Sequence, residues 1–139
     1  MMTVAFGFLI TAALLGGYLA VGYLRGPDAG SPRARITRAR ITRAWMTRAW
    51  MTRAIHGVIG AIGLVELIVA LGRHRALAPM GLGGFGAGAE ILLGLALSLG
   101  LFVAAAGWRG HRSSGFLVGA HATAAIAGLT LVLAIVSLG

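Results

Sequence analysis

The stretch AIHGVIGAIGLVELIVALG, residues 54–72, is apolar throughout except for His56 and Glu66. A helix needs about 20 mostly apolar residues to cross the hydrocarbon core of a bilayer, so this stretch predicts a transmembrane helix. Like the other apolar stretches below, in which Gly, Ala and Leu dominate, it lacks the alternation typical of membrane barrel strands. Three further stretches meet the same criterion, at about 3–24, 86–108 and 116–138. The sequence therefore predicts an all-α fold, an integral membrane four-helix bundle that forms a single domain over residues 1–139.

The composition supports this class. Of the 139 residues, 58% are hydrophobic and 11% are charged, and the mean hydropathy is +0.91. Soluble domains average roughly 45–50% apolar and about 25% charged residues, so the chain departs from them in both respects. It contains no cysteine, which excludes disulfides, cysteine-ligated metals and iron–sulfur clusters.

Arginine placement predicts the topology. Residues 25–53 carry eight arginines, the connection with Arg109 and Arg112 carries two, and Arg73 and Arg75 lie in the remaining one. Because cytoplasmic loops are enriched in basic residues, we expect the first and third connections to be cytoplasmic and both termini to be non-cytoplasmic. The first span lacks a basic leader and a clear cleavage site, so we interpret it as a retained helix. The expected location is a bacterial-type inner (plasma) membrane, crossed several times.

Residues 34–53 read ARITR ARITR AWMTR AWMTR, four pentapeptides in tandem. Five residues advance a helix by about 140°, so arginines at this spacing spiral around a helix rather than line one face. Basic segments beside a membrane attract anionic headgroups, with about 1 kcal/mol for each arginine near the surface. We expect residues 33–53 to lie on anionic lipid headgroups or to pack on a partner subunit, and we expect no nucleic-acid partner.

A second, longer repeat relates the two halves of the chain. HGVIGAIGL (56–64) aligns with HATAAIAGL (121–129) as H-x-x-x-[G/A]-x-x-G-L, and an apolar span ending in Arg25 or Arg109 precedes each. The spacing from arginine to histidine differs between the halves, but it matches within one residue once the pentapeptide block is removed. The chain is thus predicted to be two pseudo-repeated helical hairpins with an arginine-rich insert, 34–53, in the first.

The repeat places His56 and His121 near the cytoplasmic ends of the second and fourth helices. These helices lie diagonally across an up-down bundle, so the two imidazoles could face each other at similar depth. Small residues, which allow close helix approach or leave room for a flat macrocycle, follow each histidine on the same helix face. They are Gly60 and Gly63 after His56, and Ala125 and Gly128 after His121.

Two neutral imidazoles between apolar walls, with cations near a carboxylate edge, are what a porphyrin requires. Arg53, Arg109 and Arg112 are placed to meet haem propionates. On His56, His121 and the shared pattern, the chain resembles the small membrane b-type cytochromes that hold haem b between histidines of different helices. The resemblance implies haem b, electron transfer and a quinone or protein redox partner.

Bacteriochlorophyll is a less favoured cofactor. Light-harvesting polypeptides carry an A-x-x-x-H pattern, and here Thr52 and Leu117 occupy the alanine position. The remaining histidines, His74 and His111, fall in opposite connections and are expected to be solvated, so no second ligand pair is available.

Glu66 and Glu90 are two of only three acids, and both fall within spans. An intramembrane charge costs roughly 2.5–3.5 kcal/mol on insertion scales, so such a residue is a functional candidate. Neither has an acidic counterpart in the repeat, where Leu131 and Phe6 stand. The two interpretations are a role in a proton path or quinone site, and protonated or snorkelling side chains without one.

The sequence contains no nucleophile–base set, P-loop or dinucleotide fingerprint, so no catalytic residue is assigned and a stand-alone enzyme is not expected. The favoured function is a small electron-transfer subunit that binds one haem b through His56 and His121 within a larger membrane complex. The alternatives are a cofactor-free accessory or assembly subunit and a small proton-coupled transporter.

Overall fold

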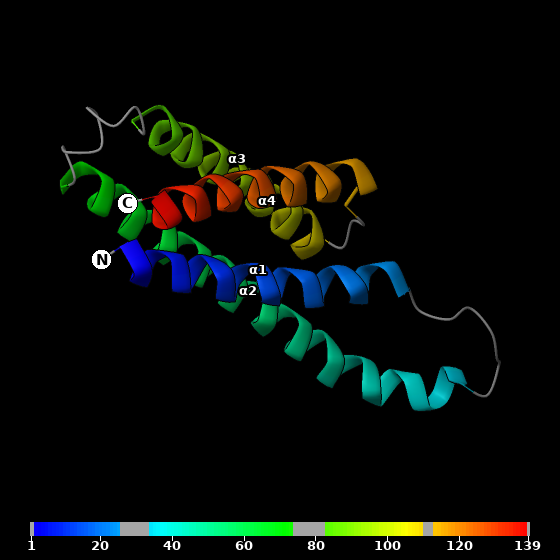
Figure 1. Ribbon diagram of the computed structural model, residues 1–139. Coiled ribbons are helices and arrows are strands. Elements are labelled where there is room, and N and C mark those ends of the chain that lie inside the picture. The colour runs from blue at the N-terminus through cyan, green and yellow to red at the C-terminus, as the bar shows by residue number, and fades with distance from the viewer. Residues whose placement is uncertain (1, 26–33, 74–82, 110–112, 139) are drawn as a thin grey trace.

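The computed structural model describes residues 2–25, 34–73, 83–109 and 113–138, and the side chains of α2 from Trp50 onward. The described residues are all-helical and form an up-down arrangement in which α1 and α3 run one way and α2 and α4 the other, with both termini at one end (Figure 1). All four helices contain a stretch long and apolar enough to cross a membrane. They are α1 (Met2–Arg25), α2 (Ala34–Arg73), α3 (Gly83–Trp108) and α4 (Gly115–Leu138).

Three predicted spans match the helices closely, and the second differs. α2 has 40 residues, against 24 to 26 for the others, because it continues through the pentapeptide block as one helix of about 60 Å. Alanine, arginine and methionine are strong helix formers, and no glycine or proline interrupts residues 34–56. Its candidate membrane span lies within Trp50–Arg73, and the N-terminal part of α2 extends past the bundle (Figure 1). α3 starts three residues earlier than predicted.

The helices pack as two hairpins, α1 with α2 and α3 with α4, and the same contacts recur in both. A Cβ atom at Gly63 of α2 would lie 3.0 Å from the Leu9 side chain of α1. A Cβ atom at Gly128 of α4 would lie 2.8 Å from Leu93 of α3. Both pairs share the register of the predicted repeat, so the two hairpins have equivalent inner faces.

The buried core lies towards the end that carries the termini, hereafter the terminus end. All four helices contribute to it, and no buried residue is polar or charged among those described. Towards the opposite, arginine end the packing loosens: none of the described side chains in 13–25, 50–62, 97–109 and 113–123 is buried. The fully buried side chains are therefore confined to one half of the bundle. The core cluster comprises Ala5, Leu9, Leu67, Ala89, Leu93 and Val132.

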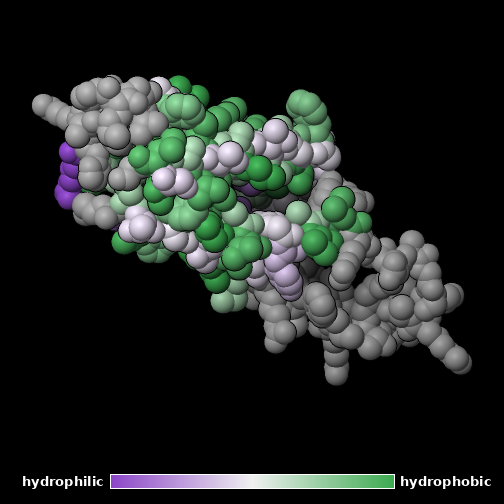
Figure 2. Space-filling view, viewed as in Figure 1, coloured by the Kyte–Doolittle hydropathy of each residue, from purple (hydrophilic) through white to green (hydrophobic). Residues whose placement is uncertain are grey.

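The outer faces are apolar, as Figure 2 shows for one side of the molecule. Large hydrophobic side chains such as Leu14, Ile91 and Ile126 are each about two-thirds or more exposed (71%, 69% and 66%). A helix that is hydrophobic all round is typical of a membrane span. The exposed apolar faces therefore fit a multi-pass membrane protein.

Substitution of Gly128 by alanine should lower thermal stability. The added Cβ would lie 2.8 Å from Cγ of Leu93, and such overpacking costs about 1–3 kcal/mol, more than the roughly 1 kcal/mol gained in helix propensity. Gly119→Ala is the matched control on the same helix, because no atom lies within 4 Å of its added Cβ. Thermal unfolding in detergent, followed by circular dichroism, should show a lower midpoint for Gly128→Ala only; equal midpoints would contradict the packing described.

Candidate functional site

The two repeat-equivalent histidines meet between the hairpins. The ring centroids of His56 on α2 and His121 on α4 are 5.9 Å apart, and the ring planes are inclined at 82°. Both side chains are half-buried, and the molecular surface is hollowed between the two hairpins (Figure 2). The structure thus brings together the two residues that the sequence singled out, from diagonally opposite helices.

Each imidazole is fixed by a backbone carbonyl of its own hairpin. Nδ1 of His56 lies 2.8 Å from the carbonyl oxygen of Ala12 on α1, and Nδ1 of His121 lies 2.7 Å from that of Ala96 on α3. A carbonyl oxygen can only accept, so Nδ1 of each ring carries the proton and donates. In the neutral ring Nε2 then has a free lone pair, the tautomer that binds a metal through Nε2.

Two glycines make these hydrogen bonds possible. A Cβ atom at Gly16 would lie 2.9 Å from Cε1 of His56, and one at Gly100 would lie 3.1 Å from Cε1 of His121. The imidazole therefore lies directly on the backbone of the neighbouring helix, one turn after the carbonyl it contacts. Sequence analysis did not assign Ala12, Gly16 or their counterparts to the site, although the shared Ala-x-x-x-Gly spacing was a signal that could have identified them.

The two histidines lie near the arginine end of the bundle at equivalent depths. His121 is six residues after Gly115, the first residue of α4, and His56 occupies the repeat-equivalent position on α2. Six residues of helix rise about 9 Å. Trp50 and Trp108 are 58% and 83% exposed at this end, as expected for aromatic residues at a membrane–water boundary.

The small residues predicted to flank a cofactor are engaged within the hairpins. Gly63 and Gly128 accommodate leucines of the adjacent helix, and a Cβ atom at Gly60 would lie 3.8 Å from that of Ala12. Ala125 is half-buried. At Gly63 and Gly128 the absence of a side chain lets the helices approach closely, which helps to position each histidine against its carbonyl.

Of the predicted arginines, Arg53 is exposed at the arginine end and its side chain reaches from α2 to α3. Its Nη1 is 3.4 Å from the position that a Cβ atom of Gly107 would occupy on α3. Arg109 is exposed directly after α3, whereas Arg112, like His74 and His111, lies outside the described residues. The guanidinium of Arg53 thus lies on the less tightly packed side of the histidine pair.

The two acids lie in the other half of the bundle. Glu66 and Glu90 are both half-buried and seven residues from Arg73 and Gly83, the helix ends at the terminus end. Glu66 is ten residues, or about 15 Å of helix, from His56. The acids are therefore separate from the histidine pair.

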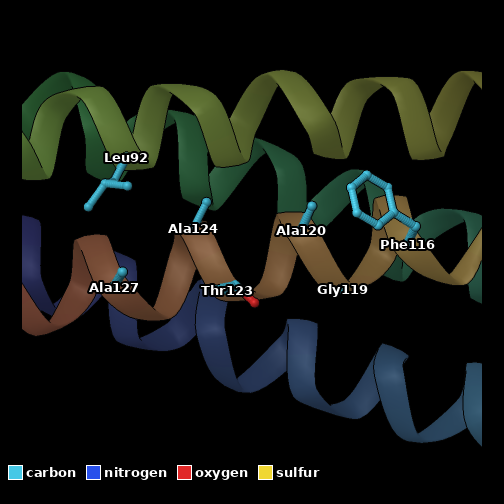
Figure 3. A pocket seen from close by; sticks show the side chains of 7 residues that line it. All are labelled: Leu92, Phe116, Gly119, Ala120, Thr123, Ala124 and Ala127. Atoms are coloured by element: carbon cyan, nitrogen blue, oxygen red, sulfur yellow. The ribbon is translucent and has the colours of Figure 1, made fainter.

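A second feature is a groove of about 540 Å³ on the α3–α4 hairpin (Figure 3). Small side chains of α4 form most of it, and Leu92 of α3 and Phe116 of α4 border it. It lies on a different face of α4 from His121 and is separate from the histidine pair. At repeat-equivalent positions, α2 carries the larger Ile55, Val58 and Ile62, so only the inner faces of the hairpins match.

The donor set restricts what the histidines could bind. Among the described residues, no group of three or more His, Cys, Asp or Glu could hold a metal ion, whereas structural zinc requires four ligands. Two imidazole nitrogens about 2.0 Å from a shared metal place the ring centroids roughly 6 Å apart, close to the observed 5.9 Å. A metal that brings its own equatorial ligands, as in a tetrapyrrole, needs only two protein ligands.

Comparison with protein-family models, curated proteins and solved structures finds no match to this chain.

Replacement of Gly16 by alanine should release His56. The added Cβ would lie 2.9 Å from Cε1, so the ring must move away from Ala12 and lose its hydrogen bond. Nitrogen-15 NMR of the imidazoles should show Nδ1-protonated rings for both histidines in the wild type, and loss of that state for His56 alone in Gly16→Ala. The adjacent Gly17→Ala, whose Cβ would meet no atom within 4 Å, should change neither ring. Unchanged signals in Gly16→Ala would contradict the hydrogen bond.

Proposed function

We propose that this protein is a small membrane electron-transfer subunit that binds one haem b between His56 and His121. The observation that carries the proposal is the geometry of the pair: two rings 5.9 Å apart, each with Nδ1 hydrogen-bonded to a backbone carbonyl. Metal-ligating histidines typically donate their other ring N–H to such a partner, which fixes the tautomer and the ring orientation.

The residues present fit this group. His56 and His121 would be its axial ligands, and Arg53 and Arg109 at the arginine end would meet its carboxylates; Arg112 is proposed with them from the sequence. When bound, this group would supply one-electron transfer. The chain's own contribution is to orient the ligands, through Ala12 and Ala96, and to surround them with apolar helix faces.

The membrane context is part of the proposal. Arginine-rich connections favour the cytoplasmic side, so we place the arginine end in the cytoplasm and both termini across the membrane, in a bacterial-type inner membrane. The described residues consist almost entirely of the four helices. The redox partners proposed are therefore other membrane subunits, or a membrane-dissolved quinone.

Loss of either histidine should abolish the haem signal. Protein purified in mild detergent and supplied with haem is expected to give a b-type reduced-minus-oxidised absorption spectrum. His56→Ala and His121→Ala should each lose it, because each removes one of two axial ligands. His74→Ala and His111→Ala are the matched controls and should retain it.

A colourless, correctly inserted wild type would overturn the proposal. The chain would then be the cofactor-free accessory or assembly subunit, tolerant of His56→Ala and co-purifying with a larger partner. If the chain is instead a proton-coupled transporter, the protein should contain no haem and Glu66→Gln should stop uptake.

The basic part of α2 is proposed to bind anionic lipid headgroups. α2 is one helix from Ala34 to Arg73, so the pentapeptide block directly continues the predicted span and we propose that it lies at the membrane surface. Replacing Arg38, Arg43 and Arg48 by Gln should weaken binding of an anionic phospholipid roughly 100-fold, at about 1 kcal/mol each. Native mass spectrometry with phosphatidylglycerol and phosphatidylcholine measures this.

The control replaces Thr37, Thr42 and Thr47 by Gln, which leaves every charge of the pentapeptides in place. It should bind phosphatidylglycerol as the wild type does. Two results would contradict lipid binding through the arginines. The wild type could retain phosphatidylglycerol and phosphatidylcholine equally, or the threonine variant could lose phosphatidylglycerol as the arginine variant does.

A further inference from the structure

The space between the hairpins differs on the two sides of the histidine pair. Towards the terminus end it is filled by the core cluster, to which all four helices contribute. Towards the arginine end, no described side chain in 13–25, 50–62, 97–109 or 113–123 is buried, and the hairpins diverge in Figure 1. The surroundings of the histidines are therefore more exposed on the arginine side than on the terminus side.

Arg53 lies on that open side. Its Nη1 is 3.4 Å from the Cβ position of Gly107, so its side chain extends from the first hairpin to the second. Gly107 is seven residues beyond Gly100, which contacts the ring of His121, and seven residues rise about 10 Å along α3. α3 ends one residue later at Trp108, and the unpaired carbonyls of a helix C-terminus favour a cation there.

Arg53 has no counterpart in the internal repeat. The position equivalent to Arg53 on α4 is Val118, and the position equivalent to Gly107 on α1 is Tyr23. Arg53 is instead the last residue of the pentapeptide block. The two hairpins thus supply matched imidazoles, whereas Arg53 has no arginine at the equivalent position of α4. Arg109, directly after α3, adds a second cation at the same end.

We infer that the site selects an iron tetrapyrrole with free carboxylates, whose carboxylate edge faces the arginine end between Arg53 and Arg109. This inference rests on the proposed haem function and states which chemical group of the ligand the site selects. A planar guanidinium pairs with a carboxylate through two parallel hydrogen bonds, which an ester cannot match because it carries no charge. Esterified tetrapyrroles, including bacteriochlorophylls, are therefore poor ligands for this site.

The test is a titration of the cofactor-free protein, in an uncharged detergent without added lipid, with haemin or with haemin dimethyl ester. Binding is followed by the Soret absorbance and by tryptophan fluorescence quenching, so that no electron-transfer activity is needed. The wild type should bind haemin at least about tenfold more tightly than the ester, as expected for hydrogen bonds to a charged group. Arg53→Gln should remove most of this preference by weakening haemin binding alone, and Arg53→Lys should restore part of it.

Arg48→Gln is the matched control, because Arg48 ends the preceding AWMTR pentapeptide. It should keep the wild-type preference. Equal affinities of the wild type for both ligands, with binding still lost in His56→Ala, would overturn the carboxylate selection and leave the haem proposal standing. The same loss in Arg48→Gln as in Arg53→Gln would also overturn it, because general positive charge would then explain the preference. Failure of the wild type to bind either ligand would overturn the haem proposal itself.

Discussion

The hydrogen bond from an imidazole Nδ1 to the carbonyl of the neighbouring helix determines the arrangement of this bundle. An unpaired N–H is costly in an apolar interior, and the carbonyls of Ala12 and Ala96 satisfy it at 2.8 and 2.7 Å. The ring lies close to these oxygens because Gly16 and Gly100 carry no side chain. The tautomer of each ring, and with it the free lone pair on Nε2, follows from this contact.

The duplication of that contact explains why the site lies between the hairpins. α1 and α3 run in the same direction, as do α2 and α4, so the hairpins are parallel repeats related by an axis along the bundle. Equivalent histidines then approach each other across this axis, with ring centroids 5.9 Å apart. Outside the shared inner face the hairpins have diverged: α4 carries a groove bordered by Leu92 and Phe116, and α2 carries the arginine-rich extension.

Much of this could be predicted from the sequence. The four spans follow from their hydrophobicity, and the pairing of His56 with His121 follows from the repeat and the diagonal position of their helices. The contacts of Gly63 and Gly128 could not be predicted, because residues on every face of these helices are apolar. Sequence periodicity then does not distinguish a glycine that receives a leucine from one that leaves space for a cofactor. The continuity of α2 was also missed, since spiralling arginines give no amphipathic pattern.

The proposed haem site requires that both imidazoles ligate one metal. Electron paramagnetic resonance of the oxidised, haem-loaded wild type in mild detergent tests it most directly, because the iron spin state reports the number of strong axial ligands. Ligation by both imidazoles predicts a wholly low-spin ferric signal in the wild type and a high-spin signal in any iron retained by His121→Ala. A high-spin signal in the wild type, or a spectrum unaffected by His121→Ala, would contradict it.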